Sequence, residues 1–168
     1  GCPSAHRPGP EATALTASRR LAWAPGVTVE PAEEPGQLVQ GPDTRLVLRP
    51  SMPAVAHALG LLGSPGADED RLVAQVLEIG GAEALAVWYY LLRRCAHRGL
   101  LHRAVYADDH CLATFLPTGP DYPIDPPASP RRPVRLSRFA YLRRDDDRLV
   151  MESPRSHARV TLNDPRAA

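Results

Sequence analysis

Residues 72–101 read "LVAQVLEIGGAEALAVWYYLLRRCAHRGLL", and this stretch carries the clearest fold signal in the chain. Gly80 and Gly81 divide it, because glycine is a poor helix former. After the division, Leu85, Trp88 and Leu92 recur at steps of three and four residues, which is the spacing of one helix face. Gly99 then suits the left-handed position that ends a helix. The stretch therefore predicts two helices, the second at residues 82–98.

The residues before this stretch predict one more helix. Ser51 can cap it, and apolar residues at helical spacing continue to about Leu62. The segment "GSPG" at residues 63–66 ends it, and the acidic residues 68–70 favour the start of the next helix. The region therefore contains three predicted helices.

Strand signals lie on both sides of the predicted helices. Before them, residues 26–30, 37–40 and 44–49 predict a β-meander with a turn at residues 41–43. After them, residues 102–116 predict a hairpin that turns around residues 107–109. A β-meander followed by three helices and a β-hairpin predicts an α+β fold of the winged helix-turn-helix type.

The C-terminal residues predict a second β-meander. In "YLRRDDDRLV" three Asp residues suit a turn between two strands, and residues 158–162 form a third strand. Asp164 and Pro165 then resemble the N-cap and first residue of a helix. A helix cut after one turn has nothing to bury, so we expect a second winged-helix-like unit that is truncated in this fragment of a longer protein.

Composition completes the predicted domain organisation. Residues 1–20 are polar and aperiodic, which predicts a disordered extension before a winged-helix domain at residues 21–116. Seven prolines between Pro117 and Pro133 predict an extended linker at residues 117–133. Residues 134–168 hold the strands of the truncated second unit.

Charge and hydropathy exclude several classes of function. The net charge is +1, which gives no general attraction to nucleic acid or to an anionic membrane. No apolar run approaches the roughly 18 residues that span a bilayer, and the N-terminal residues lack the apolar core of a secretory signal. We therefore expect a cytoplasmic protein that binds no membrane.

The sequence contains no recognisable catalytic or metal-binding motif. It lacks a P-loop, a dinucleotide-binding fingerprint, a G-x-S-x-G segment and an HExxH segment. Three cysteines at irregular spacing do not form a disulfide framework. One group of possible metal ligands lies close in sequence: Cys95, His97, His102, His110 and Cys111. The spacing of this group matches no paired-ligand pattern, so we expect no metal site. Because the catalytic motifs are also missing, we expect no catalytic residue.

The third predicted helix argues against DNA binding. A recognition helix needs polar side chains near its N-terminal end to reach base edges. Here residues 82–90 read "AEALAVWYY", which is apolar and aromatic. Nucleic acid is therefore not an expected partner. A winged-helix DNA-binding regulator stays as an alternative, as does a degenerate winged helix that serves only as an assembly surface.

The same helix carries more apolar residues than one core face needs. If Trp88 and Leu92 face the core, then Val87, Tyr90 and Leu91 lie partly on another face. They could pack under the hairpin at residues 102–116, or they could line a groove beside the strand at residues 44–49, where a peptide adds as one more strand. Strand alternation turns Leu46 and Leu48 towards the core. The candidate peptide-binding residues are Arg45, Val47, Arg49, Val87, Tyr90, Leu91 and Arg94.

Two segments resemble known families. Residues 27–63 and 72–101, ending in "RGLL", resemble the PqqD-like fold, the recognition element for precursors of ribosomally synthesised and post-translationally modified peptides (RiPPs). Residues 135–168, "RLSRFAYLRRDDDRLVMESPRSHARVTLNDPRAA", resemble a region of SagB-type thiazoline/oxazoline dehydrogenases. In that family the region precedes a flavin-binding domain of the nitroreductase type.

The resemblance implies a function that the motifs alone do not give. It implies the non-catalytic N-terminal region of an FMN-dependent dehydrogenase that oxidises azolines to azoles in a ribosomal peptide. Its expected partners are a precursor leader peptide or a cyclodehydratase. FMN and the family's catalytic Lys-Tyr pair are expected beyond Ala168, so no cofactor is expected in this fragment. The oligomeric state does not follow from the resemblance.

Overall fold

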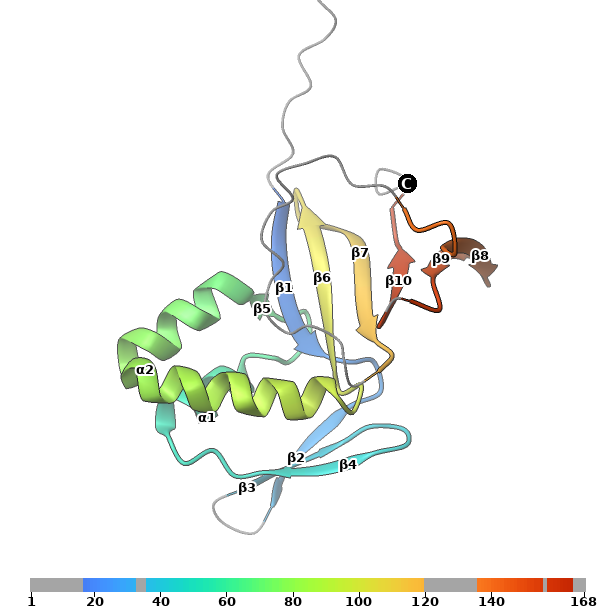
Figure 1. The fold of residues 1–168 in the computed structure, drawn as a ribbon. Coiled ribbons are helices and arrows are strands. Elements are labelled where there is room, and N and C mark those ends of the chain that lie inside the picture. The colour runs from blue at the N-terminus through green and yellow to red at the C-terminus, as the bar shows by residue number, and fades with distance from the viewer. Residues whose placement is uncertain (1–16, 33–35, 120–135, 156, 165–168) are drawn as a thin grey trace, which may run out of the picture.

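The computed structural model describes residues 17–32, 36–119, 136–155 and 157–164, whose arrangement is shown in Figure 1. Its first sheet has three antiparallel strands, β2 (Thr28–Ala32), β3 (Gly36–Gln40) and β4 (Arg45–Leu48). The second has seven strands in the spatial order β5-β1-β6-β7-β10-β9-β8. Its members are β1 (Ala17–Trp23), β5 (Ala67–Asp68), β6 (Leu101–Ala107), β7 (His110–Pro117), β8 (Tyr141–Asp145), β9 (Arg148–Glu152) and β10 (Ala158–Leu162). With the helices α1 (Pro53–Gly60) and α2 (Glu69–Ala96), the fold is α+β, as predicted.

Proline, aspartate and glycine residues mark where the helices begin and where α2 breaks. Pro53 begins α1, but the predicted cap Ser51 is not its N-cap: Met52 holds that position and makes no side-chain capping bond. The Asp68 carboxylate caps α2 by accepting a hydrogen bond from the Arg71 backbone amide at 2.9 Å. Inside α2, Gly81 leaves helical geometry with φ 69° and ψ −168°, so α2 consists of two helical segments joined at a kink. The predicted break at the glycine pair is therefore confirmed.

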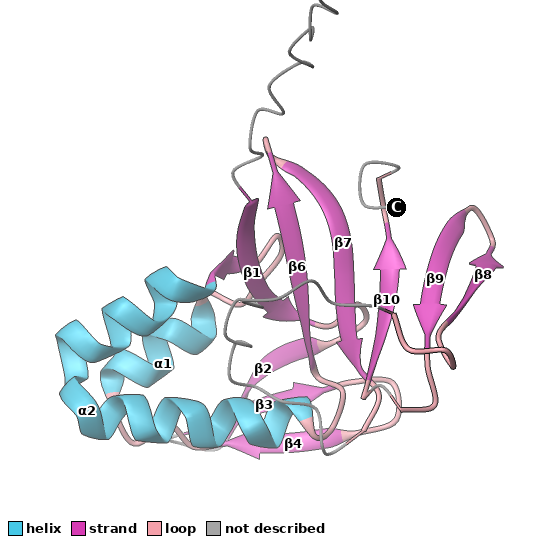
Figure 2. Ribbon diagram, turned by 45° about the horizontal axis from the view of Figure 1, so that its top comes forward, coloured by secondary structure: helices cyan, strands magenta, loops and turns pink. Residues whose placement is uncertain are grey.

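The three-stranded sheet and the C-terminal segment of α2 share one hydrophobic core. Leu48 of β4 and Val39 of β3 are fully buried with Trp88 of α2 in this core. Figures 1 and 2 both show α2, beyond its kink, running over this sheet. Burial of these large apolar side chains is the main force that holds the helix on the sheet.

The first strand begins earlier than the sequence predicts. Residues 17–20, which we expected to be disordered, belong to β1, and β1 pairs along its whole length with β6. The two arginines in this segment have partners from distant elements. Arg19 bonds Asp70 at 3.1 Å, and Arg20 lies 4.2 Å from the centroid of the Tyr106 ring. The sequence analysis assigned these polar residues to a disordered segment because the residues that they contact lie far away in the sequence.

The second meander forms where the sequence predicts it. Asp146 takes a positive φ of 54° in the turn between β8 and β9, and β10 covers the predicted residues 158–162. However, β10 also pairs with β7, from Ala158 opposite Pro117 to Leu162 opposite Ala113. The strands expected in a second unit therefore extend the sheet of the first, which removes an open edge at β7. The predicted helix at Pro165 and residues 120–133 of the linker lie outside the described residues.

On length and composition alone, α2 could cross a membrane, which the sequence analysis did not anticipate. Core helices of soluble domains pass the same test. In this fold, α2 is broken at Gly81 and buries Trp88, Leu92 and Cys95 in the core. Its Glu69 carboxylate also makes a buried ion pair with Arg103 of β6 at 2.6 Å. These contacts favour a domain helix.

Candidate functional site

Strand β4 lies at an edge of the three-stranded sheet. It pairs with β3 on one side, and no strand in the described part of the chain pairs with the other side. The Gly41 amide donates a hydrogen bond to the Thr44 carbonyl at 2.9 Å, which fixes the alternation of hydrogen bonds along the hairpin. By that alternation Leu46 bonds towards β3, whereas the backbone groups of Arg45 and Val47 point to the open edge. An added peptide strand could pair with those outward groups.

The side chains of β4 alternate as the sequence predicts. Leu46 is 5% exposed and Leu48 is fully buried, while Val47 is 38% exposed on the opposite face. Arg45 and Arg49 are also exposed. The strand therefore uses one face to anchor the sheet in the core and offers a different set of side chains to a partner.

The C-terminal segment of α2 supplies the other candidate residues, and they differ in exposure. Tyr90 is 60% exposed and Val87 is half-buried. The Arg94 guanidinium lies 5.7 Å from the centroid of the Tyr90 ring, at the distance of a cation–π contact. The helix thus presents an aromatic side chain together with a cation.

The structure corrects two predictions for this helix. Leu91 was expected to line the groove, but it is 3% exposed and belongs to the core. It lies three residues after Trp88 and four before Cys95, so it shares their buried stripe. Leu85, expected in the core, is only half-buried, and Ala84 is fully buried in its place.

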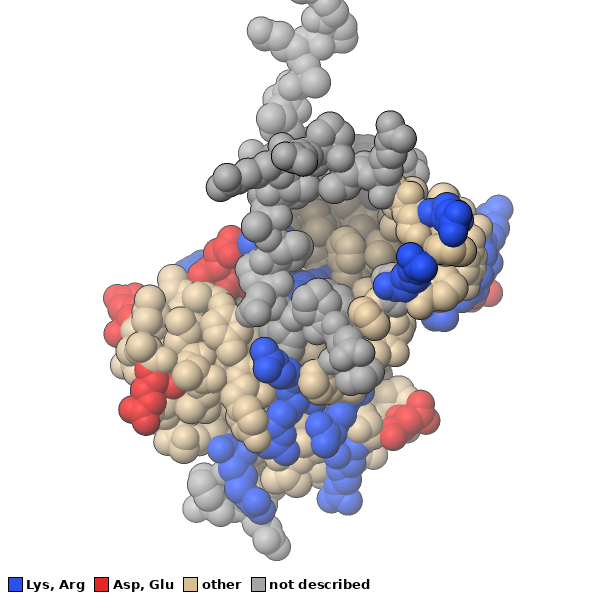
Figure 3. All heavy atoms as spheres, viewed as in Figure 1, with Lys and Arg blue, Asp and Glu red and all other residues tan. Residues whose placement is uncertain are grey.

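A basic patch surrounds this edge, and sequence reasoning missed part of it. Figure 3 shows basic side chains gathered over β4 and the C-terminal end of α2. The basic patch consists of Arg45, Arg49, Arg93, Arg94 and Arg98. No ion pair joins these five arginines to a carboxylate in the residues that the structure describes. Of these five, the sequence analysis singled out Arg45, Arg49 and Arg94 as candidate binding residues and did not include Arg93 and Arg98 among them.

The cysteine and histidine residues weighed as metal ligands do not come together. Cys95 is fully buried, and burial raises the pKa of its thiol to about 12, which keeps it protonated. His102 Nδ1 lies 2.9 Å from the Trp23 carbonyl oxygen, and burial lowers the pKa of its imidazole. No group of three His, Cys, Asp or Glu side chains suited to a metal occurs within the described residues.

Two family models match the chain. The model described as "ThcOx helix turn helix domain" matches residues 18–125, which is more than half of the chain. The model described as "Cyanobactin oxidase ThcOx" matches residues 134–168. Among curated proteins, no significant match was found. The first match begins within β1, in agreement with the ordered strand at residues 17–23.

Proposed function

The chain belongs to the family of the ThcOx helix-turn-helix domain, and from this premise we propose that it is the leader-peptide recognition region of a RiPP-modifying oxidase. The open edge of β4 is the observation that carries the proposal. Its outward backbone groups belong to Arg45 and Val47, whose side chains are exposed. Strand addition at such an edge suits a domain that must hold related peptides.

The leader would add antiparallel to β4. Backbone hydrogen bonds would supply affinity that depends little on sequence, and alternate side chains would meet Val87 and Tyr90 on α2. Acidic side chains in the leader would pair with arginines of the basic patch, because guanidinium groups bind carboxylates with charge-assisted hydrogen bonds. Selectivity would come from these side-chain contacts.

We also propose that the oxidase is of the SagB type and that the recognition fold is the PqqD-like winged helix. This rests on the resemblances in residues 27–63, 72–101 and 135–168. The reaction would be the oxidation of azolines to azoles by FMN, in a domain outside these 168 residues. Arg45, Arg49 and Arg94 border an exposed edge and not an enclosed cavity, so this site does not fit a flavin. We derive no catalytic step here, and a cyclodehydratase partner could dock on the same region.

The proposal is tested by placing the same charge at two positions of similar exposure, one on each edge strand of the three-stranded sheet. Val47 on β4 is 38% exposed, and Val29 on β2, the other edge strand of the sheet, is 39% exposed. We expect Val47→Asp to weaken binding of the fluorescently labelled cognate leader about tenfold by putting an unpaired charge at the site. Val29→Asp should leave the affinity unchanged.

Fluorescence polarisation measures the two affinities, and thermal melts check that both variants stay folded. Equal loss in the two variants would point to a general effect of charge. No loss in folded Val47→Asp would exclude the β4 edge and favour the assembly-surface alternative.

A further inference from the structure

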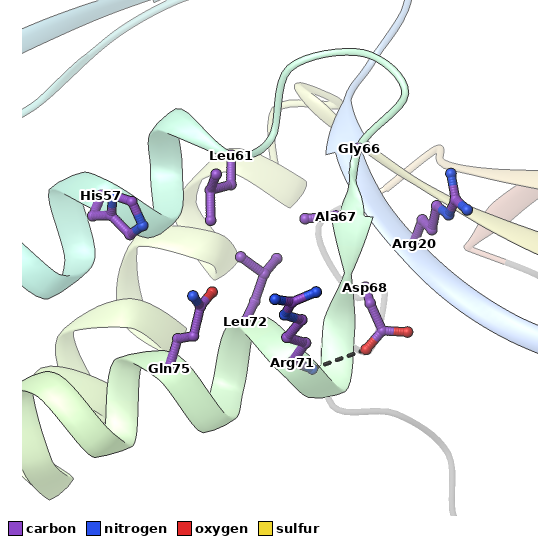
Figure 4. A pocket seen from close by; sticks show the side chains of 9 residues that line it. All are labelled: Arg20, His57, Leu61, Gly66, Ala67, Asp68, Arg71, Leu72 and Gln75. Atoms are coloured by element: carbon purple, nitrogen blue, oxygen red, sulfur yellow. Dashed lines mark hydrogen bonds between the residues drawn. The ribbon is translucent and has the colours of Figure 1, made fainter.

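A separate pocket of about 460 Å³ opens between α1, β5 and the start of α2. Figure 4 shows the side chains that line it. None of them belongs to the β4 edge or to the basic patch. The pocket is therefore independent of the leader site, and it calls for its own chemical interpretation.

The floor of this pocket is apolar. Leu72 of α2 is 1% exposed, and Leu61, just after α1, is 37% exposed. In Figure 4 both side chains lie between the two helices, with Ala67 of β5 beside them. The floor can cover the methylene groups of a short aliphatic chain, whereas a bare inorganic ion would leave it exposed to water.

Hydrogen-bond donors surround this floor. Arg71 and Gln75 lie four residues apart, so they share one face of α2. His57 of α1 lies across from them in Figure 4. Arginine offers five N–H donors and no acceptor, the glutamine amide offers two donors, and a neutral imidazole offers one.

Two of the charged groups that line the pocket, Asp68 and Arg20, each have a partner. The Asp68 carboxylate accepts the hydrogen bond of the Arg71 backbone amide at 2.9 Å, and the Arg20 guanidinium pairs with Asp109 at 3.4 Å. The Arg71 guanidinium, by contrast, pairs with no carboxylate in the part of the chain that the structure describes. The pocket thus has a surplus of donors and calls for a ligand that supplies acceptors.

We propose that this pocket binds the glutamate side chain of a partner peptide. The carboxylate lies against the Arg71 guanidinium between His57 and Gln75, and the side-chain methylenes cover Leu61 and Leu72. A carboxylate matches the planar fork of arginine and can accept two parallel hydrogen bonds. The mouth of the pocket is open, which leaves room for the peptide backbone outside.

A residue-level ligand tests this assignment in the 168-residue chain. N-acetyl-glutamic acid N-methylamide and its glutamine counterpart are titrated separately while backbone amide shifts are followed by NMR. The glutamate compound should shift the amides of residues 71–75 and bind about tenfold more tightly than the neutral one, because its hydrogen bonds are charge-assisted. Inorganic phosphate serves as the anion without a methylene chain and should bind more weakly.

Substitutions test whether the glutamate compound binds in this pocket. Arg71→Gln should weaken the glutamate compound about tenfold, and Gln75→Ala should weaken it less. Arg148→Gln, at an exposed arginine on β9, is the matched control and should bind like the wild type. Val47→Asp should also bind normally, so that failure of this site and failure of the leader site are distinguishable.

Several outcomes would overturn the proposal. They are equal binding of the two amino-acid compounds, phosphate binding as tight as that of the glutamate compound, and unchanged affinity in both pocket variants when melts show them folded.

Discussion

At the scale of single residues, alternation along β4 separates the residues that pack in the core from those proposed to bind the leader. Leu48 is fully buried in the core, whereas Val47 beside it is 38% exposed. The two side chains leave opposite faces of the strand, so we expect the same substitution to affect stability differently at these neighbouring positions.

We expect Leu48→Asp to unfold the chain, because a buried carboxylate without a partner costs several kcal/mol and removes a large apolar side chain from the core. Val47→Asp should change the thermal midpoint little. Circular dichroism melts of both variants measure the difference. Similar melting of the two proteins would contradict the assignment of the two faces.

The sequence predicts correctly which side chains of β4 are buried, but it does not predict this correctly for every residue of α2. Alternate side chains of a strand point to opposite faces of the sheet. Once Leu46 and Leu48 are placed on the core face, the positions of their neighbours follow. On a helix, the spacing alone does not fix how wide the buried stripe is, and packing places Leu91 in the core. The open edge of β4 depends on which strands pair in space, and the sequence gives no direct signal of that.

At the scale of secondary-structure elements, the kink in α2 positions both candidate sites. Its first segment forms a wall of the glutamate pocket, and its second lies over β4 (Figure 1). Gly81 makes the turn with a φ of 69° and a ψ of −168°, which is a region that only glycine occupies readily. The angle between the two segments therefore depends on this residue.

Gly81→Ala should lower the free energy of unfolding by about 1–3 kcal/mol through backbone strain alone. A Cβ at Gly81 would meet no atom within 4 Å, so steric contact adds nothing. Gly60→Ala is the matched control, since its Cβ also meets open space but its position is the last residue of α1. The control should be neutral or more stable by about 0.4–1 kcal/mol in urea unfolding. Equal stability of the two variants would show that the kink carries no strain.

The second meander is tied together by Glu152. Its carboxylate accepts hydrogen bonds from Arg143 at 3.2 Å, Tyr141 at 3.0 Å and Arg159 at 2.5 Å, on β8 and β10. Arg143 and Tyr141 lower the pKa of Glu152 to about 2, below its ordinary value of 4.5. Because the folded-state pKa is lowered, the stabilisation is present above pH 4.5 and is lost as the pH falls towards 2.

Amide hydrogen exchange from pH 7 down to pH 3 should therefore show loss of protection in β8 and β9 below pH 4.5. Glu152→Gln should show weaker protection already at neutral pH and less further change on acidification. Protection in β8 and β9 that does not change with pH in the wild type would mean that Glu152 does not hold these strands.

At the scale of the whole molecule, the local elements were predictable and their assembly was not. Both meanders, the hairpin and the helix break follow from turn residues and periodicity close in sequence. The joining of β10 to β7 and of β1 to β6 involves residues far apart in the chain, for which the sequence gives no local signal. Those pairings turn two predicted units into one continuous seven-stranded sheet.

The distribution of charge over the whole molecule bears on whether a peptide or DNA is the better candidate partner. The basic patch is the feature that would favour DNA, but it surrounds the end of α2 and the edge of β4, while residues 82–90 at the start of the helical segment are mostly apolar. Reading base edges needs polar side chains at that start. With a net charge of +1, attraction to phosphates should be weak and easily screened by salt.

We therefore expect mobility-shift assays at physiological salt to show no sequence-specific complex. Any complex at low salt should form equally with unrelated duplexes and should dissociate as salt is raised, because it rests on phosphate contacts from a few arginines. Replacing Arg94 and Arg98 by Gln should reduce that low-salt binding for every sequence alike. Nanomolar binding that discriminates between sequences would make the regulator the better assignment, since only base contacts or DNA shape produce such discrimination.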